Sequence, residues 1–198
     1  MKYSQARIGF LSFLVVFAVT LNVPGADVSR AKGQRNDPAE SKLIADMASD
    51  DTRKVLNALD GLEGKPDAGT NVILAARKLL PDPRPVVRKK AARVLGAIHA
   101  PLDGADLKAI CRMLKSYDKS EADDALKALR GLEASETIPE IIPLLKSPHD
   151  LLVRDACRTL AVLGSKEQIP VIEPLLKHSN SDVRIDAQSA ITTLQAKN

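Results

Sequence analysis

The chain has 198 residues and a formal net charge of +4, and 44% of its residues are hydrophobic. Aromatic residues make up only 3% and tryptophan is absent, so the core has to be built from Leu, Ile, Val and Ala, which suits closely packed helices. The small net charge does not indicate a polyanionic partner, and two cysteines are too few for the disulfide framework of a small secreted protein.

The N-terminus predicts export. Lys2 and Arg7 precede an apolar run from Ile8 to Val23, which small residues follow. This is the layout of a secretory signal peptide, here residues 1–25, and we therefore expect a periplasmic or secreted protein. The alternative is an uncleaved anchor that tethers the protein to a membrane, although the run is shorter than the roughly 20 residues that span a bilayer. Residues 26–36 show no periodicity and are expected to form a flexible arm.

From residue 37 onward the sequence is repetitive. Residues 136–166 align with residues 167–197 without a gap, and Asp155, for example, recurs as Asp186. The second half of this unit is a small or apolar residue followed by Leu or Ile four and seven positions later. It occurs five times, as Val55/Leu59/Leu62, Ala91/Leu95/Ile98, Ala125/Leu129/Leu132, Ala156/Leu160/Leu163 and Ala187/Ile191/Leu194.

These spacings place each trio on one face of a helix, and each trio follows another amphipathic segment. We therefore predict five stacked helix–loop–helix units that share a continuous core, and no sheet. The units are expected at residues 37–63, 70–99, 104–133, 136–164 and 167–197. In the first unit Asp37 is the expected N-cap, Pro38 occupies the first helical position, and Glu40 has the reciprocal place in a capping box.

Asp82, Val87-Arg88 and the following "KKAARVLGAI" resemble the signature of the HEAT repeat, especially the bacterial phycobilisome-lyase-type HEAT-like repeat. Residues 151–164 and 182–194 resemble it too, whereas the third unit has Glu121-Ala122 where Val-Arg is expected. The resemblance extends over about residues 37–197. It implies an all-α fold, an α-α superhelix in which residues 37–198 form a right-handed solenoid of about five HEAT-like hairpins.

The resemblance also implies three activities, each of which lacks support in the residues. Deoxyhypusine hydroxylase binds metal through paired His-Glu motifs, but none of His99, His149 and His178 is followed by Glu. HEAT-like DNA glycosylases use aromatic residues with an acid in a basic cleft, but Tyr117 is the only aromatic residue after the predicted signal peptide. Bilin lyases act in the cytosol, which does not fit an exported chain. We expect no metal, no cofactor, no nucleic acid and no catalytic residues.

Cys111 and Cys157 fall beside predicted core positions and are expected to be buried thiols. A candidate binding site is a basic row on the second helices, the concave face of such solenoids. It consists of Arg93, Lys127 and Arg158, with Lys89 and Lys90 nearby. The alternative is that Asp124 and Asp155, three residues before Lys127 and Arg158, neutralise the row. Lys89 and Lys90 lack such acids in the sequence, so the face is expected to be net positive there.

The hypothesis that fits these features best is an exported, monomeric, non-catalytic scaffold or adaptor that binds another protein. One alternative is a HEAT-like lyase-type enzyme, or enzyme subunit, that handles a chromophore or another prosthetic group. Nucleic-acid binding is a further alternative.

Overall fold

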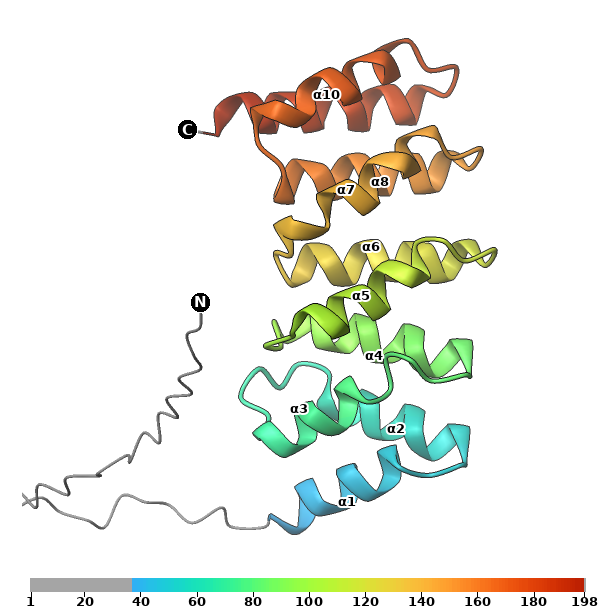
Figure 1. The fold of residues 1–198 in the computed structure, drawn as a ribbon, viewed down its shortest axis with the longest axis vertical. Coiled ribbons are helices and arrows are strands. Elements are labelled where there is room, and N and C mark those ends of the chain that lie inside the picture. Colours follow the sequence, from blue (N-terminus) through green and yellow to red (C-terminus); the bar gives the residue numbers. More distant parts are fainter. Residues whose placement is uncertain (1–36, 198) are drawn as a thin grey trace, which may run out of the picture. The chain divides into compact units, whose positions relative to one another are not determined.

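The computed structural model describes residues 37–197, and that range contains helices and no strand (Figure 1). The α-helices are α1 (Pro38–Met47), α2 (Thr52–Leu62), α3 (Thr70–Arg77), α4 (Pro85–Ala97), α5 (Gly104–Met113), α6 (Lys119–Gly131), α7 (Ile138–Ile141), α8 (Asp150–Leu163), α9 (Ile169–Ile172) and α10 (Ser181–Ala196). Short 3₁₀ helices flank α7 and α9, namely η2 (Ser135–Thr137), η3 (Ile142–Lys146), η4 (Lys166–Gln168) and η5 (Glu173–Lys177). The predicted all-α solenoid is confirmed.

The predicted signal peptide (residues 1–25) and arm (residues 26–36) lie outside the described residues. Within residues 37–197, no helix combines the length and the apolar character that a membrane crossing requires.

Five helical hairpins stack in chain order, from α1–α2 to α9–α10 (Figure 1). The second helices pack closely on one another, α2 on α4, α4 on α6, α6 on α8 and α8 on α10. Among the first helices, only α1 and α3 make comparable contact. Such a difference is expected when the second helices line the inner side of a curved stack. The exposed side chains of α2, α4, α6, α8 and α10 are called the second-helix face below.

The predicted trios form the core of this stack. Fourteen of their fifteen residues are buried, and only Leu132 is partly exposed, at the end of α6. Each trio therefore faces the core on one side of its helix, as the four-and-three spacing predicted.

Two glycines let α4 and α6 approach until their backbones touch. A Cβ atom placed on Gly96 would lie 2.7 Å from the Cα atom of Ala128, and one on Gly131 would lie 2.6 Å from the carbonyl oxygen of Gly96. Ordinary carbon contacts are about 3.5–4.0 Å. Only glycine therefore fits at either position without moving a helix.

The first helices of the last two hairpins are broken. α7 and α9 have four residues each and continue as the 3₁₀ helices η3 and η5. Pro143 and Pro174 lie at these breaks. Because proline has no N–H to donate and its ring clashes with the carbonyl four residues back, an α-helix does not continue through it.

The capping prediction for α1 was half right. Asp37 is the N-cap and its Oδ1 accepts a hydrogen bond from Ala39 N at 2.9 Å, with Pro38 at the first helical position. Glu40, however, does not complete a capping box. Its Oε1 accepts from the backbone N–H of Gly69 at 3.2 Å, at the start of α3, so this carboxylate ties the first hairpin to the second.

The loops inside the five hairpins share a hydrogen bond that the sequence did not reveal. In each loop, a side chain accepts from the backbone N–H of the residue two positions later, which is the N-cap of the second helix. The acceptors are Ser49, Asp82, Ser116, Ser147 and His178. The signature arginines Arg88 and Arg184 each donate to two carbonyls of their own loop. The signature thus fixes the loop as well as the packing.

Candidate functional site

The five residues of the predicted basic row all lie on second helices. Lys89, Lys90 and Arg93 belong to α4, Lys127 to α6 and Arg158 to α8. The structure brings acidic side chains to four of them.

The prediction that Lys89 and Lys90 lack acidic neighbours was wrong. Lys89 Nζ lies 3.3 Å from Asp118 Oδ2, and Lys90 forms ion pairs with Asp60 and Glu63, the latter at 2.7 Å. The hydrogen bond from Lys90 lowers the pKa of Glu63. These acids belong to the neighbouring hairpins, so no spacing within the second hairpin predicts them.

Lys127 and Arg158 are neutralised as the intramolecular alternative required, with one change of partner. Arg158 pairs with Asp155 at 3.3 Å, as predicted, and also with Asp186 on α10 at 3.0 Å. Lys127 pairs with Asp123 at 2.6 Å rather than with the predicted Asp124. The reason is that four residues along a helix bring these two side chains into register as well as three do.

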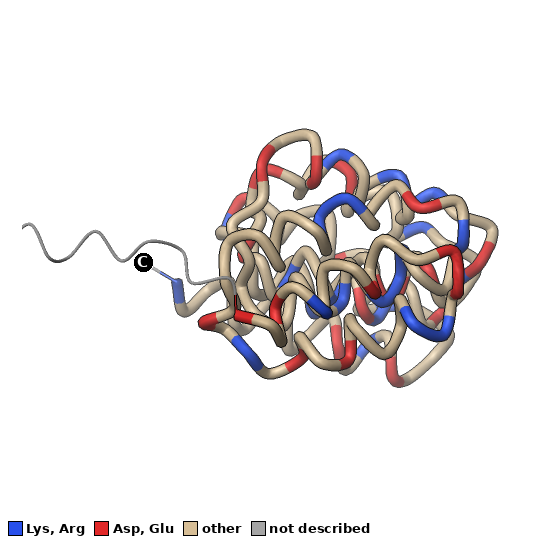
Figure 2. The backbone as a smooth tube through the Cα atoms, turned by 90° about the horizontal axis from the view of Figure 1, so that it is seen from below, with Lys and Arg blue, Asp and Glu red and all other residues tan. Residues whose placement is uncertain are grey.

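The ion pairs follow the stacking. Arg154 on α8 reaches Asp186 on α10 at 2.7 Å, much as Lys89 on α4 reaches the start of α6. Viewed along the stack, basic and acidic positions are interspersed (Figure 2). The second-helix face is therefore a set of alternating charges that joins adjacent hairpins, and not a uniformly basic surface.

Two carboxylates meet between α6 and α8. Burial raises the pKa of Asp155, and the facing carboxyl group of Asp123 raises it further, while Arg158 and Lys127 oppose the shift. Asp123 Oδ1 is buried without a hydrogen-bond partner among the described residues. Asp123 occupies the position on α6 that corresponds to Lys89 on α4 and Arg154 on α8. Among the second helices of residues 37–197, only α6 has an acid at this position.

Arg93 differs from the rest of the row. Its side chain is exposed, as those of Lys127 and Arg158 are, but it forms no ion pair with any residue of the described range 37–197. Asp124 lies near it: burial raises the pKa of this carboxyl group, and Arg93 is the charge that opposes the shift most.

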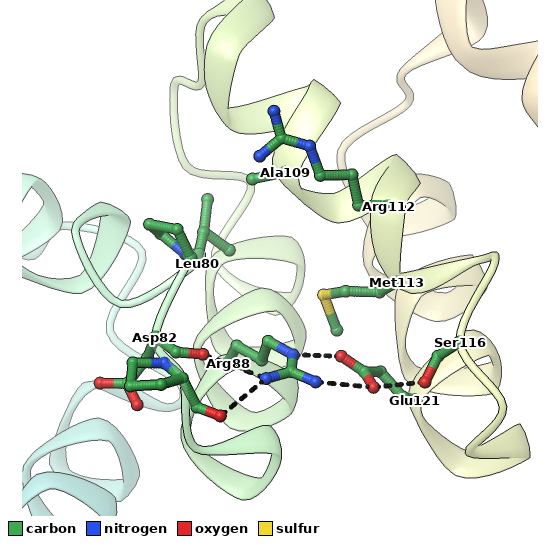
Figure 3. A pocket seen from close by; sticks show the side chains of 10 residues that line it. Leu80, Asp82, Arg88, Ala109, Arg112, Met113, Ser116 and Glu121 are labelled. Atoms are coloured by element: carbon green, nitrogen blue, oxygen red, sulfur yellow. Dashed lines mark hydrogen bonds and ion pairs between the residues drawn. The ribbon is translucent and has the colours of Figure 1, made fainter.

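A hollow of about 370 Å³ opens beside the loop between α3 and α4. At one end, Arg88 faces Glu121, whose carboxylate also accepts from Ser116 Oγ at 2.6 Å (Figure 3). Glu121 is only 2% exposed and occupies the place where the repeat signature has valine. Burial alone would raise the pKa of Glu121, but the hydrogen bonds from Arg88 and Ser116 lower it. The departure of the third unit from the signature is thus matched by a partner from the second unit.

The remaining candidate groups have structural positions. Cys111 and Cys157 are buried, as predicted, and burial raises the pKa of the first thiol to about 11 and of the second to about 12. His149 is the N-cap residue of α8, and His178 Nδ1 accepts from Asn180 N at 3.1 Å. In the part of the chain that the structure describes, no three His, Cys, Asp or Glu side chains converge as metal ligands do.

A family model described as HEAT repeats matches residues 107–192. None of the curated proteins matches the sequence. Among solved structures, the complex of CpcE and CpcF of phycocyanin lyase from Nostoc sp. PCC7120 is similar with a TM-score of 0.67 and 22% identity, over 83% of this chain and 69% of that one. An engineered protein is similar with a TM-score of 0.61 and 23% identity, over 80% of this chain and 79% of that one.

A computationally designed armadillo repeat protein for modular peptide recognition is also similar, with a TM-score of 0.56 and 18% identity, over 79% of this chain and 82% of that one. At these identities the likeness concerns the fold. Residues 107–192 thus match a model of HEAT repeats, and residues 37–197 together form a helical solenoid with the fold of these structures.

Proposed function

We propose that the protein is an exported, non-catalytic scaffold that binds another protein on its second-helix face, with Arg93 as the anchoring charge. The observation that supports this function is the state of the charges on that face. Lys89, Lys90, Lys127 and Arg158 are each paired within the solenoid, whereas Arg93 is exposed and has no ion-pair partner among residues 37–197.

An arginine in this position suits a carboxylate of a partner. Its planar group donates two parallel hydrogen bonds to a carboxylate. The paired charges around Arg93 discriminate between partners. A partner has to match their alternating signs, because like charges in contact repel each other. The designed armadillo repeat protein, which shares the fold, is described as made for modular peptide recognition, and a row of stacked helices offers such a surface here as well.

Export is part of the proposal and rests on the sequence of residues 1–25. N-terminal sequencing of the protein from its native fraction tests it. A mature chain that begins near residue 26 supports export, and a chain that retains Met1 in a soluble cytosolic fraction contradicts it.

Binding is tested by affinity capture from the envelope and secreted fractions with three baits. These are the unchanged protein, Arg93→Glu, and Lys166→Glu, which makes the same charge change at an exposed site on η4. Loss of a buried interfacial charge pair costs about 2–5 kcal/mol, so Arg93→Glu should weaken a genuine partner at least about thirtyfold. A partner that all three baits recover equally, or no enriched partner at all, contradicts the proposal.

The alternative is a lyase-type enzyme or enzyme subunit, and it is favoured by the similarity to the CpcE–CpcF complex of phycocyanin lyase. The two functions can be distinguished by absorbance. A protein that handles a chromophore absorbs visible light when it is purified together with its pigment, and a scaffold does not. Against it, the buried carboxylate Glu121 is paired with Arg88 and is not available as a general acid or base.

A further inference from the structure

A second surface lies on the opposite side of the hairpins, between the first helices α3 and α5. The hollow of about 370 Å³ described above adjoins one of about 420 Å³, and the two share Pro81, Ala109 and Arg112. Together they form one depression, called the α3–α5 groove. It is separate from Arg93 and its neighbours on the second-helix face.

The groove follows from the packing of the second helices. Gly96 and Gly131 draw α4 and α6 into backbone contact, while α3 and α5 make little contact with each other. Close approach on one side of a layer separates the helices on the other side. The ion pair between Arg77 Nε and Asp106 Oδ2, at 2.6 Å, connects the two walls at one end.

The lining of the groove combines an apolar floor with charged side chains and lacks aromatic rings. Leu74 is 42% exposed and projects from α3, while Pro81, Ala105 and Ala109 complete the surface. Tyr117, the one aromatic residue of the described part of the chain, is not among the lining residues. Such a surface suits aliphatic side chains better than nucleic-acid bases, which stack on aromatic rings.

The rim of the groove is basic. Lys78, Lys108 and Arg112 are exposed, and none of them forms an ion pair with a residue in the range 37–197. The three acids in the lining are already compensated, Asp82 by Arg84, Asp106 by Arg77 and Glu121 by Arg88. The groove therefore has a net positive charge around an apolar floor.

We propose that the α3–α5 groove binds an extended acidic segment of a partner protein, with aliphatic side chains on the floor and carboxylates at Lys78, Lys108 and Arg112. Charge complementarity selects this occupant. The chain's own arm, residues 26–36, contains Arg30, Lys32 and Arg35 against one acid, so it has the same sign as the rim.

The length of α5 sets the size of the bound segment. Its 10 residues extend about 15 Å, a distance that about five residues of an extended chain cover. An octapeptide is therefore long enough as a probe.

The test is a fluorescence-anisotropy titration of the full chain against a fluorescein-labelled octapeptide of alternating Glu and Leu. We expect saturable binding that weakens as sodium chloride is raised, because exposed charges are screened. The double variant Lys108→Glu/Arg112→Glu should bind at least tenfold more weakly. Lys166→Glu and Arg93→Glu should bind as the unchanged protein does, and Leu74→Asn, which keeps every charge, should also weaken binding.

Three outcomes overturn the proposal: no saturable binding of the Glu–Leu peptide, equal loss with Lys166→Glu, or tighter binding of a peptide of alternating Lys and Leu. Tighter binding of an oligothymidine of the same length would assign the groove to nucleic acid instead. Circular dichroism of the double variant separates loss of binding from loss of fold. Because Arg93→Glu tests the second-helix face alone, either surface can fail while the other stands.

Discussion

Replacing a glycine in a helix by alanine usually stabilises the helix. The contact between Gly96 and Gly131 predicts the opposite result at these two positions. Alanine is normally favoured in a helix by about 1 kcal/mol. At Gly96, however, the new Cβ atom would lie 2.7 Å from the Cα atom and 2.9 Å from the carbonyl oxygen of Ala128. These are backbone atoms, which cannot rotate away, so α4 and α6 would have to separate by about 1 Å to restore ordinary contact.

We therefore expect Gly96→Ala to destabilise the protein. Overpacking costs about 1–3 kcal/mol, and a clash with backbone belongs at the upper end of that range. After subtraction of the helical preference for alanine, the expected net loss is about 2 kcal/mol. Gly131→Ala breaks the same contact from the other side, so the double variant should lose less than the sum of the two single losses.

The measurement is urea unfolding followed by circular dichroism, with Gly104→Ala as the matched control. Gly104 is the first residue of α5, and no heavy atom lies within 4 Å of a Cβ atom built on it. That variant should be as stable as the unchanged protein or slightly more stable. If Gly96→Ala matches Gly104→Ala, the α4–α6 contact does not limit the packing and the explanation of the α3–α5 groove fails with it.

Three further predictions concern buried groups. Glu121→Gln should lower the free energy of unfolding by about 1–3 kcal/mol at pH 7. Because the folded-state pKa of Glu121 is lowered, the difference in stability between the unchanged protein and the variant should shrink as the pH falls through that pKa. An equal difference at pH 7 and pH 3 would contradict this. Asp155→Asn should stabilise the protein by about 1 kcal/mol at pH 7. Burial and the facing Asp123 destabilise the ionised form of Asp155 and so raise its pKa, whereas the new amide is neutral and can donate to Asp123. Unfolding at low pH should show no such gain. Cys111 and Cys157, whose pKa values are about 11 and about 12, should react with Ellman's reagent only after unfolding, and rapid release of colour from the native protein would refute their burial.

Much of the fold could be predicted because it repeats. The trio that includes Ala91, Leu95 and Ile98 has the period of a helix and recurs along the chain, so the number of hairpins and the buried stripes follow from the sequence. The breaks at Pro143 and Pro174 were not predicted, although the prolines were visible in the repeat. Amphipathic spacing survives the change from α-helix to 3₁₀ helix over so few residues.

The candidate site was harder to predict, since the charges of the second-helix face are paired across hairpins. Lys90 meets Asp60 and Glu63 only because α4 packs on α2. Within its own helix it has no acid three or four residues away, so the i,i+3 and i,i+4 rules that identified the partner of Arg158 did not apply. The sequence did mark Glu121 as a departure from the signature, but not its partner.

The sequence by itself determined the helical hairpins, the buried stripes and the burial of the two thiols, because these depend on local periodicity and on where apolar side chains recur. Only the tertiary structure decided which charges remain available to a partner. Ion pairs form between residues that stacking brings together, about 30 positions apart along the chain. For that reason four residues of the basic row are paired and only Arg93 has no ion pair among residues 37–197. For the same reason no sequence motif indicated the groove between α3 and α5.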